Sequence, residues 1–347
     1  MSMTHLRFGV IGWGYWGPKL ARNLESLPHV MVTMVADSDP HRLASLAINE
    51  YQSWIRKTTQ AEEVFRSDVD GVVIATPVRT HYQLAKAALL HGKHVLVEKP
   101  LTTNVTEAEE LVALAHEQQR ILMVGHTFEY NPAVNELRKL VQSGDLGKIY
   151  CIEAERLNLG LYRSDINVIW DLAPHDISIL LYLLGKKPEQ IEVQAHAHLQ
   201  SRIHDIAHLD LKFADGMTAH IHVSWLYPCK IRRVTVIGDL RMAVYDDTNP
   251  AEMIKIYNKG ADVHADPLVS YRFGAITIPH IDWIEPLRLE CEDFANAIRA
   301  GTQPRAHGYV GLEVVRVLAA AQEVLEKQER QNSTITVRVY EAIDRAG

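Results

Sequence analysis

The sequence Phe8-Gly9-Val10-Ile11-Gly12-Trp13-Gly14-Tyr15-Trp16-Gly17 decides the fold of the first part of the chain. It is an apolar run that stops at a glycine, and residues 18–27 follow it with helical periodicity. The spacing G-x-G-x-x-G between a strand and a helix is typical of a dinucleotide-binding loop. In such a loop the first glycine makes the tight turn, the second lets the backbone approach a pyrophosphate, and the third allows close helix–strand packing. The alternative is a purely structural glycine turn.

Apolar runs and helical patterns alternate after this loop. Buried strands are predicted at 30–36, 71–75, 94–97 and 121–124. Helices are predicted at 61–66, 80–90 and 106–119. Thr106 and Glu109 have the spacing of a capping box at the start of the last helix. Because apolar strands between helices indicate a parallel sheet covered on both faces, residues 1–127 are expected to form a doubly wound α/β domain, the Rossmann fold.

The remaining residues, 128–347, show a different pattern. Helices are predicted at 131–142, 174–184, 285–299 and 311–328. Strands are predicted at 149–157, 191–199, 208–213, 217–224, 231–237, 241–245, 254–257 and 334–339. Few helices separate these strands, and the Ala214-Asp215-Gly216 step is a hairpin signal. We therefore expect a second, α+β domain built on a largely antiparallel open sheet.

Composition narrows the class of protein. The chain has 347 residues, 47% of them hydrophobic, and a formal net charge of −7, which argues against a nucleic-acid partner. Its cysteines, Cys151, Cys229 and Cys291, fit neither a disulfide framework nor a zinc site. Residues 1–7 lack the apolar core of a signal peptide, and no apolar run is long enough to span a bilayer. We expect a cytoplasmic protein with no membrane partner.

Asp37 stands at the end of the second predicted strand. A carboxylate there can accept hydrogen bonds from the ribose hydroxyls of a dinucleotide, which favours NAD over NADP because a 2′-phosphate would be repelled. Arg42 lies nearby in the sequence and would soften that preference. The alternative is an aspartate that initiates the turn at Ser38-Asp39-Pro40.

Two further segments end strands of the predicted parallel sheet. Ala75-Thr76-Pro77 and the nearby His81 are expected to touch the cofactor, although Thr76 equally suits a helix cap. Glu98-Lys99-Pro100 places an ammonium group at the carboxyl edge of the sheet. A cation there can stabilise a developing alkoxide or tune a neighbouring base. The alternative is an ordinary surface Glu–Lys pair.

Taken together, these segments and a downstream Asp171-x-x-x-His175 resemble the Gfo/Idh/MocA family, the relatives of glucose–fructose oxidoreductase and inositol dehydrogenase. The resemblance covers nearly the whole chain and implies a nicotinamide-dependent sugar oxidoreductase. It implies that Lys99, Asp171 and His175 are catalytic. The expected cofactor-binding residues are Gly12, Gly14, Tyr15, Trp16, Gly17, Asp37, Ala75, Thr76, Pro77, His81, Glu98 and Lys99. The family often has a glycine between the aspartate and the histidine, where this chain has Leu172-Ala173-Pro174.

The Asp171–His175 pair also makes sense from its residue types. Residues four apart share one face if the segment is helical. Pro174 suits the first turn of a helix, which would put Asp171 near the N-cap. A histidine there can take the proton of a substrate hydroxyl while hydride leaves the same carbon, and Asp171 can orient it or bind a neighbouring hydroxyl. The alternative is that His175 only caps or packs.

Polar residues around the predicted domain junction are candidates for substrate contact. The expected set is Tyr130, Arg156, Asn158, Tyr162, Arg163, Asn167, Asp171 and His175. These side chains suit sugar hydroxyls or a phosphate, and a solvated loop is the alternative for the segment before Asp171. Asn131 suits either a ligand contact or a helix cap. His220 and His222 alternate on a strand without a third ligand, so no metal is expected.

Residues 126–132 and 170–176 most resemble the branch of the family that acts at C3 of nucleotide-activated sugars and aminosugars. An inositol or free-sugar dehydrogenase, and a sugar–sugar transhydrogenase that keeps its cofactor, are the enzymatic alternatives. A non-enzymatic NAD(H) sensor would be expected to lack Lys99 or His175, and both are present. By analogy with the family, the second sheet is expected to pack between subunits of a homodimer or homotetramer.

Overall fold

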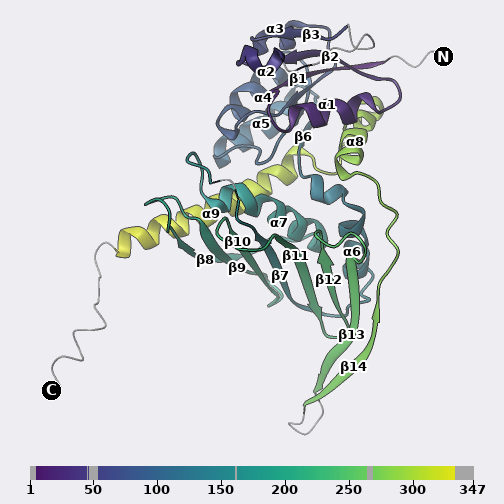
Figure 1. The fold of residues 1–347 in the computed structure, drawn as a ribbon, viewed down its shortest axis with the longest axis vertical. Helices are drawn as coiled ribbons and strands as arrows, with labels where there is room; N and C mark the ends of the chain where they lie inside the picture. The colour runs from purple at the N-terminus through teal and green to yellow at the C-terminus, as the bar shows by residue number, and fades with distance from the viewer. Residues whose placement is uncertain (1–4, 45, 47–53, 161, 264–268, 333–347) are drawn as a thin grey trace, which may run out of the picture.

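The computed structural model describes residues 5–44, 46, 54–160, 162–263 and 269–332. The described chain forms two β-sheets, each with helices packed against it, and Figure 1 shows the first sheet above the second. The long helix α9 (Gly308–Asn332) crosses between them.

The first sheet has six parallel strands in the order β3-β2-β1-β4-β5-β6. The strands are β1 (Leu6–Ile11), β2 (Val30–Ala36), β3 (Arg56–Thr58), β4 (Gly71–Ile74), β5 (His94–Val97) and β6 (Leu122–Val124). The helices between them are α1 (Gly17–Glu25), α2 (Pro40–Ala44), α3 (Ala61–Arg66), η2 (Val78–Thr80), α4 (His81–Leu90) and α5 (Val105–Glu117). The predicted Rossmann sheet is confirmed. Strand order reverses between β1 and β4, which opens a ligand crevice at their carboxyl ends.

The second sheet has eight strands in the order β14-β13-β12-β11-β7-β10-β9-β8. Its strands are β7 (Ile149–Leu157), β8 (Gln190–His196), β9 (Ile206–Lys212), β10 (Thr218–Ser224), β11 (Ile231–Gly238), β12 (Met242–Asp246), β13 (Ile254–Val263) and β14 (Val269–Thr277). All neighbours are antiparallel except β7 and β10, which run parallel. The predicted, largely antiparallel sheet is confirmed.

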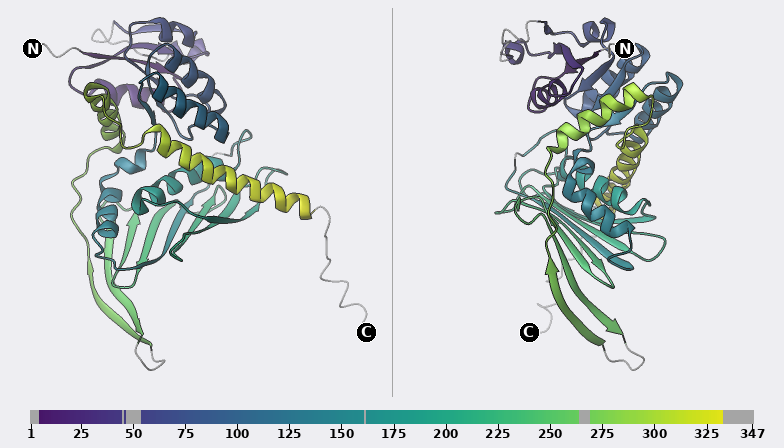
Figure 2. Two further views of the ribbon diagram at one scale, coloured as in Figure 1. Left: turned by 180° about the vertical axis from the view of Figure 1, so that it is seen from behind. Right: turned by 90° about the vertical axis from the view of Figure 1, so that its right-hand side faces the viewer.

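In the described ranges, helices cover one face of this sheet. The elements η3 (Thr127–Tyr130), α6 (Pro132–Gln142), α7 (Val168–Leu184) and α9 belong to this part of the chain. Figure 2 shows α6, α7 and α9 on the side toward the first sheet. Alternation along β9 agrees, because Leu209 and Leu211 are buried while His208 is exposed.

The remaining helix, α8 (Pro286–Ala300), packs against the first sheet although it lies late in the sequence. Phe294 packs its ring 5.5 Å from that of Phe8 on β1, and Cys291 is buried beside Leu20 on α1. By its packing, α8 therefore belongs to the first core. The expected domain boundary between residues 127 and 128 remains a prediction.

Two helix starts differ from the sequence expectation. The side chain of Asn104 caps α5, with its Oδ1 accepting from the backbone N–H of Thr106 at 2.8 Å and of Glu107 at 3.2 Å. The prediction of a capping box formed by Thr106 and Glu109 is therefore wrong. An asparagine caps more effectively than a threonine because its carbonyl reaches two free N–H groups of the first turn.

The second difference concerns α7, which begins at Val168 rather than at Pro174. Asn167 is its N-cap, accepting from Ile169 N–H at 3.1 Å and Trp170 N–H at 3.2 Å. Pro174 lies inside the helix, so the expectation that it starts the helix is wrong. A strong cap and the burial of the preceding apolar turn outweigh the local cost of an interior proline.

Strand β14 was not anticipated from the sequence; it pairs with β13 in a hairpin that extends away from the rest of the sheet (Figures 1 and 2). The predicted strand at 334–339 lies outside the described residues. None of the helices in the described ranges combines the length and apolarity needed to cross a membrane.

Replacing Phe294 with alanine should destabilise the protein by about 3–5 kcal/mol, because it empties a fully buried aromatic site between α8 and β1. Equilibrium denaturant curves measure this loss as a lower midpoint. Phe273→Ala is the matched control, since that ring is 79% exposed and its loss should change the unfolding free energy by less than about 0.5 kcal/mol. Equal shifts for both variants would contradict the docking of α8 on the first sheet.

Candidate active site

The glycine loop between β1 and α1 has the geometry of a phosphate cradle. Gly12 adopts a positive φ of 97°, and a Cβ there would lie 2.4 Å from the Ala75 carbonyl oxygen. A Cβ on Gly17 would lie 1.9 Å from the carbonyl oxygen of Gly12. Above Gly14, by contrast, the nearest atom is a guanidinium nitrogen of Arg42 at 3.7 Å. Packing requires the outer two glycines, and the middle one leaves space for a ligand beside the start of α1.

A groove of 550 Å³ runs from this loop along the carboxyl ends of β1, β2 and β4. Its lining includes Gly12, Asp37, Ala75, Thr76 and Pro77. Its position at the strand-order reversal fits the adenosine half of a dinucleotide. The exposed Tyr15 lies outside this lining, with Lys19 Nζ 3.3 Å from its ring centroid.

Asp37 both organises the turn that follows β2 and lines the groove. Its Oδ2 accepts from Trp13 N–H at 2.6 Å, and its Oδ1 accepts from Asp39 N–H at 2.8 Å, so it does organise the turn. It also lines the groove although only 6% of the residue is exposed. Arg42 Nη1 lies 3.6 Å from Oδ2 and therefore screens this carboxylate.

His81 does not line the groove, and its expected contact with a cofactor stays a prediction. It is buried and lies 2.8 Å from two carbonyl oxygens, through Nδ1 to Pro100 and through Nε2 to Thr76. The imidazole therefore ties the loop after β4 to the loop after β5. Burial lowers the pKa of His81, and the two backbone contacts act in the opposite direction.

A smaller pocket of 150 Å³ lies where the first sheet meets α7. Its lining comes from both halves of the chain: Trp16, Ala75, Thr76, Pro77, Val78, Glu98, Lys99, Pro100, Arg163, Ile166, Trp170 and Asp171. Six of the residues predicted from the sequence for the cofactor or for catalysis thus share one pocket with Asp171. We call this space the catalytic pocket.

Lys99 crosses from the first sheet to α7. Its Nζ donates a hydrogen bond to the backbone oxygen of Asp171 at 2.9 Å. Burial lowers the pKa of Lys99, while the nearby carboxylates of Asp171 and Glu98 oppose that change. Burial also raises the pKa of Glu98 to about 7. Little water therefore surrounds the Lys99 amine, and a positive charge on it acts more strongly on a negative charge developing nearby.

The carboxylate of Asp171 is fixed by two further donors. Trp225 Nε1–H donates to Oδ2 at 3.0 Å, and Arg163 Nη1 lies 3.7 Å from Oδ1. Arg163 also forms a two-pronged pair with Asp165. Trp225 follows β10 directly and was missed by the sequence analysis, because a single tryptophan after a strand carries no signal of its own.

His175 lies one helical turn after Asp171 on the same face of α7, as its spacing predicts. Its ring packs edge-on against Phe128, with centroids 5.1 Å apart. Burial lowers the pKa of His175 well below its usual value, and the cations of Lys99 and Arg156 act in the same direction. Its imidazole is therefore neutral near pH 7 and able to accept a proton. Its buried Nδ1 has no partner among the described residues.

Three of the expected substrate contacts have strong internal partners. Tyr130 is buried, donating to Asp293 at 2.7 Å and accepting from Ala306 N–H at 3.1 Å. Arg156 forms a buried two-pronged pair with Asp176 at 2.8 and 2.9 Å. Asn167 caps α7, as described above. These partners give each side chain a structural role, and its contact with a substrate stays a prediction.

Two other expected contacts lie beside the catalytic pocket without lining it. Tyr162 packs its ring 5.3 Å from that of Trp225. Asn158 donates its backbone N–H to Ser224 at 3.2 Å, at the end of β10. Asn131 caps α6 through Oδ1 to Ala133 N–H at 2.9 Å, which confirms the capping alternative.

Within the described ranges, no three His, Cys, Asp or Glu side chains are placed to hold a metal. His220 lies against Asp210, and His222 stacks on His208 with centroids 4.0 Å apart. The three cysteines are unpaired with one another.

Comparison with known proteins agrees with this geometry. Residues 6–126 match the model of the oxidoreductase family with an NAD-binding Rossmann fold, and residues 134–244 match the GFO/IDH/MocA C-terminal domain. The chain is 32% identical over 324 residues to UDP-N-acetylglucosamine 3-dehydrogenase of Acidithiobacillus ferrooxidans, covering 93% of this chain and 97% of the relative. It is 25% identical over 336 residues to inositol 2-dehydrogenase 1 of Saccharopolyspora erythraea, covering 92% and 94%.

A solved structure of the Acidithiobacillus ferrooxidans UDP-N-acetylglucosamine 3-dehydrogenase is similar throughout, with a TM-score of 0.78, 28% identity, and coverage of 93% of this chain and 98% of that one. The glycine cradle, the groove beside Asp37 and the meeting of Lys99 with α7 are thus set in a fold shared over almost the entire length. The chain belongs to the Gfo/Idh/MocA family of NAD-binding oxidoreductases.

Proposed function

We propose that this protein is an NAD-dependent dehydrogenase that transfers a hydride between the nicotinamide and a ring carbon, C3, of a nucleotide-activated sugar or aminosugar. The observation that carries the proposal is the contact of Lys99 with α7, which sets a desolvated ammonium beside the turn that bears Asp171 and His175. Lys99 and Asp171 line a pocket that shares Ala75, Thr76 and Pro77 with the groove suited to the dinucleotide.

A bound nicotinamide supplies the hydride acceptor or donor. In the oxidative direction, the neutral imidazole of His175 accepts the proton of the substrate hydroxyl. The ammonium of Lys99 stabilises the oxygen as negative charge develops on it. Asp171, held by Trp225, orients a substrate hydroxyl. In the reductive direction the same groups act in reverse, with the proton returning from the imidazole.

A second cleft supports a nucleotide-activated substrate over a free sugar. It measures 520 Å³ and shares Val78, Ile166 and Trp170 with the catalytic pocket, so the two spaces adjoin. Arg79 and Arg202 line it. Two guanidinium groups beside a sugar-sized pocket suit the diphosphate of a nucleotide sugar, since arginine pairs with phosphate through parallel hydrogen bonds. The relative that acts on UDP-N-acetylglucosamine supports the same substrate class.

Preference for NAD over NADP is part of the proposal and rests on Asp37. Its carboxylate lines the groove and would face a 2′-phosphate, although Arg42 at 3.6 Å reduces the repulsion. Assembly into a homodimer or homotetramer through the second sheet is also proposed. Its support is that helices cover one face of this sheet while the other stays uncovered in the described part of the chain (Figure 2). A cytoplasmic location stays an expectation from the sequence.

A substrate panel tests the proposal directly. Purified protein with NAD should reduce the cofactor, seen as absorbance at the nicotinamide band, with UDP-N-acetylhexosamines in preference to inositol or free hexoses. Arg202→Ala should raise KM for the nucleotide sugar by roughly tenfold while leaving kcat near its original value, because it removes a charge-assisted contact to phosphate. Turnover of inositol alone would favour the inositol dehydrogenase alternative, and tight NADH binding without turnover would favour the sensor.

Lys99→Ala and His175→Ala should each lower kcat by about 10²–10⁴-fold, because they remove the cation and the base. NAD affinity, measured by fluorescence or calorimetry, should stay within a few fold. Lys86→Ala and His116→Ala are matched controls on the helices α4 and α5, away from the catalytic pocket, and should keep full activity. A large loss of NAD affinity in His175→Ala would contradict its role as a base.

Asp37→Ala should weaken NAD binding and narrow the ratio of kcat/KM for NAD over NADP, because the carboxylate that excludes a 2′-phosphate is gone. Steady-state kinetics with both cofactors measure the ratio. Because Asp37 also accepts a hydrogen bond from the backbone of Trp13, circular dichroism is needed to check the fold of the variant. The spectrum should be native. An unchanged ratio in a folded variant would show that Asp37 serves only the turn.

A further inference from the structure

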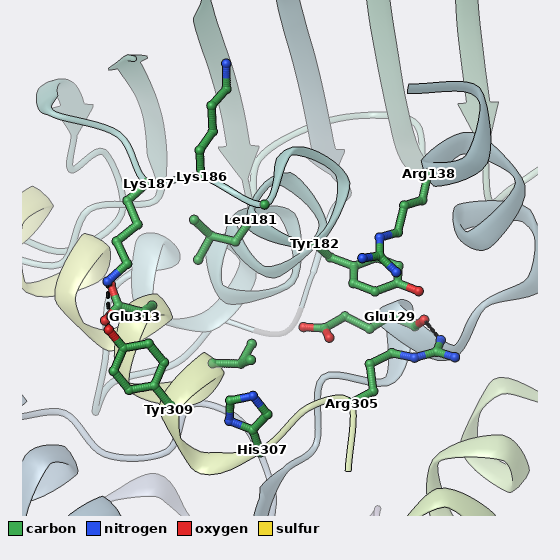
Figure 3. A pocket seen from close by; sticks show the side chains of 12 residues that line it. Glu129, Arg138, Leu181, Tyr182, Lys186, Lys187, Arg305, His307, Tyr309 and Glu313 are labelled. Atoms are coloured by element: carbon green, nitrogen blue, oxygen red, sulfur yellow. Dashed lines mark hydrogen bonds and ion pairs between the residues drawn. The ribbon is translucent and has the colours of Figure 1, made fainter. Parts of the chain in front are cut away.

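We propose a second ligand site, for a small organic anion, in a cavity at the far end of α7 from the catalytic pocket. The cavity measures 340 Å³ and lies between η3, α6, the end of α7 and the start of α9 (Figure 3). Its lining is Glu129, Arg138, Leu181, Tyr182, Gly185, Lys186, Lys187, Arg305, His307, Tyr309, Val310 and Glu313. We call it the α7–α9 cavity.

This cavity is separate from the site proposed for the dehydrogenase. It shares no lining residue with the catalytic pocket or with the groove beside Asp37. Asp171 and Gly185 are roughly four helical turns apart on or just beyond α7, which corresponds to about 20 Å along the helix axis. A ligand in the α7–α9 cavity would therefore be distinct from cofactor and substrate.

Positive charge dominates the lining. Neither Arg138 nor Arg305 forms an ion pair with a carboxylate in the described part of the chain. Arg138 stacks on the ring of Tyr182 at 4.2 Å, and Arg305 bonds to neutral oxygens of Glu129 and Asn135. Their charges are therefore not cancelled locally, and a guanidinium group in that state favours an anion.

The other charged groups do not reverse this balance. Lys186 pairs with Asp215, and Lys187 pairs with Glu313 at 2.9 Å. Glu313 also contacts Arg316 at 2.7 Å. The first turn of α9, the positive end of its helix dipole, lines the cavity through Tyr309 and Val310, and the backbone N–H groups of Val310 and Gly311 donate to the carbonyl of His307.

Glu129 is the second, independent observation that points to a ligand. It is only 1% exposed, and its Oε1 has no hydrogen-bond partner among the residues that the structure describes. Figure 3 shows its carboxyl group pointing into the cavity, away from Arg305 and toward the space between Leu181 and His307. A buried polar group of this kind normally has a partner, so the missing one is expected to come from a bound molecule.

The protonation state of Glu129 also fits an anion. Burial raises the pKa of Glu129 to about 8, against the opposing effect of Arg305 and Arg138. The acid is therefore mostly protonated near pH 7 and presents an O–H donor to the cavity. Burial lowers the pKa of His307, which leaves its imidazole neutral and able to donate one N–H.

The remaining wall is apolar and sets the kind of anion. Leu181, Tyr182, Tyr309 and Val310 supply aliphatic and aromatic surface. The volume lies within the usual range of small-molecule sites, about 300–1,000 Å³. A phosphate or carboxylate attached to a ring or a short apolar group therefore suits the cavity better than a bare inorganic ion.

Calorimetric titration of the intact protein tests this site, with NADH present in excess so that the cofactor groove is filled. The probes are phenyl phosphate and inorganic phosphate at constant ionic strength. Phenyl phosphate should bind with one site per chain and more tightly than inorganic phosphate. Arg138→Gln and Glu129→Leu should each weaken phenyl phosphate by roughly tenfold, because each removes one donor.

Two matched variants sharpen the test. Glu129→Gln keeps a donor at the same place and should bind phenyl phosphate within a few fold of the original protein. Arg66→Gln removes an exposed guanidinium on α3, outside the cavity, and should bind unchanged. Equal weakening in Arg138→Gln and Arg66→Gln would show nonspecific charge attraction and overturn the proposal, as would the absence of binding.

A crystal soaked in phenyl phosphate gives an independent readout if Glu129→Leu fails to fold. The phosphate is expected beside Glu129 and Arg138, with the phenyl ring against the apolar wall of the cavity. Bound phosphate only at the glycine loop or beside Arg202, with an empty α7–α9 cavity, would overturn the proposal.

Discussion

The hydrogen bond from Lys99 Nζ to the backbone oxygen of Asp171 is the contact on which the arrangement of the active site depends. A buried ammonium needs acceptors because water no longer surrounds it. The carboxyl end of β5 brings the lysine to the crevice, and α7 offers it an oxygen there. The contact therefore joins the first sheet to the helix that carries Asp171 and His175.

Burial, rather than ion pairing, has the largest effect on the pKa values of the acids around this contact. Burial raises the pKa of Glu98 to about 7 despite the neighbouring Lys99, and it raises the pKa of Glu290 on α8 well above its usual value. Both carboxyl oxygens of Glu290 are buried, and the Thr127 side chain only partly opposes this effect of burial. Because burial favours the neutral form of both acids, they compensate a positive charge on Lys99 less than two ionised carboxylates would.

Local patterns in the sequence were enough to predict the first sheet and much of the catalytic pocket. The glycine loop, Ala75-Thr76-Pro77 and Glu98-Lys99-Pro100 all end strands of one parallel sheet, so their meeting follows from topology. The sequence could not show the partners that long-range contacts provide. Tyr130 is bonded to Asp293 and Arg156 to Asp176, and neither partner is adjacent in sequence. The start of α7 was misplaced because a proline was given more weight than the asparagine cap before it.

Trp225 shows why the second half of the site was harder to foresee. In the otherwise antiparallel second sheet, β7 and β10 run parallel, so Leu157 and Ser224 end side by side. Carboxyl ends of adjacent parallel strands meet at one edge, and this edge faces the start of α7. Trp225, directly after β10, thereby reaches the carboxylate of Asp171. Both sheets thus contribute to the catalytic pocket by the same topological rule, but in the second sheet the rule applies to a single strand pair that no local sequence pattern identifies.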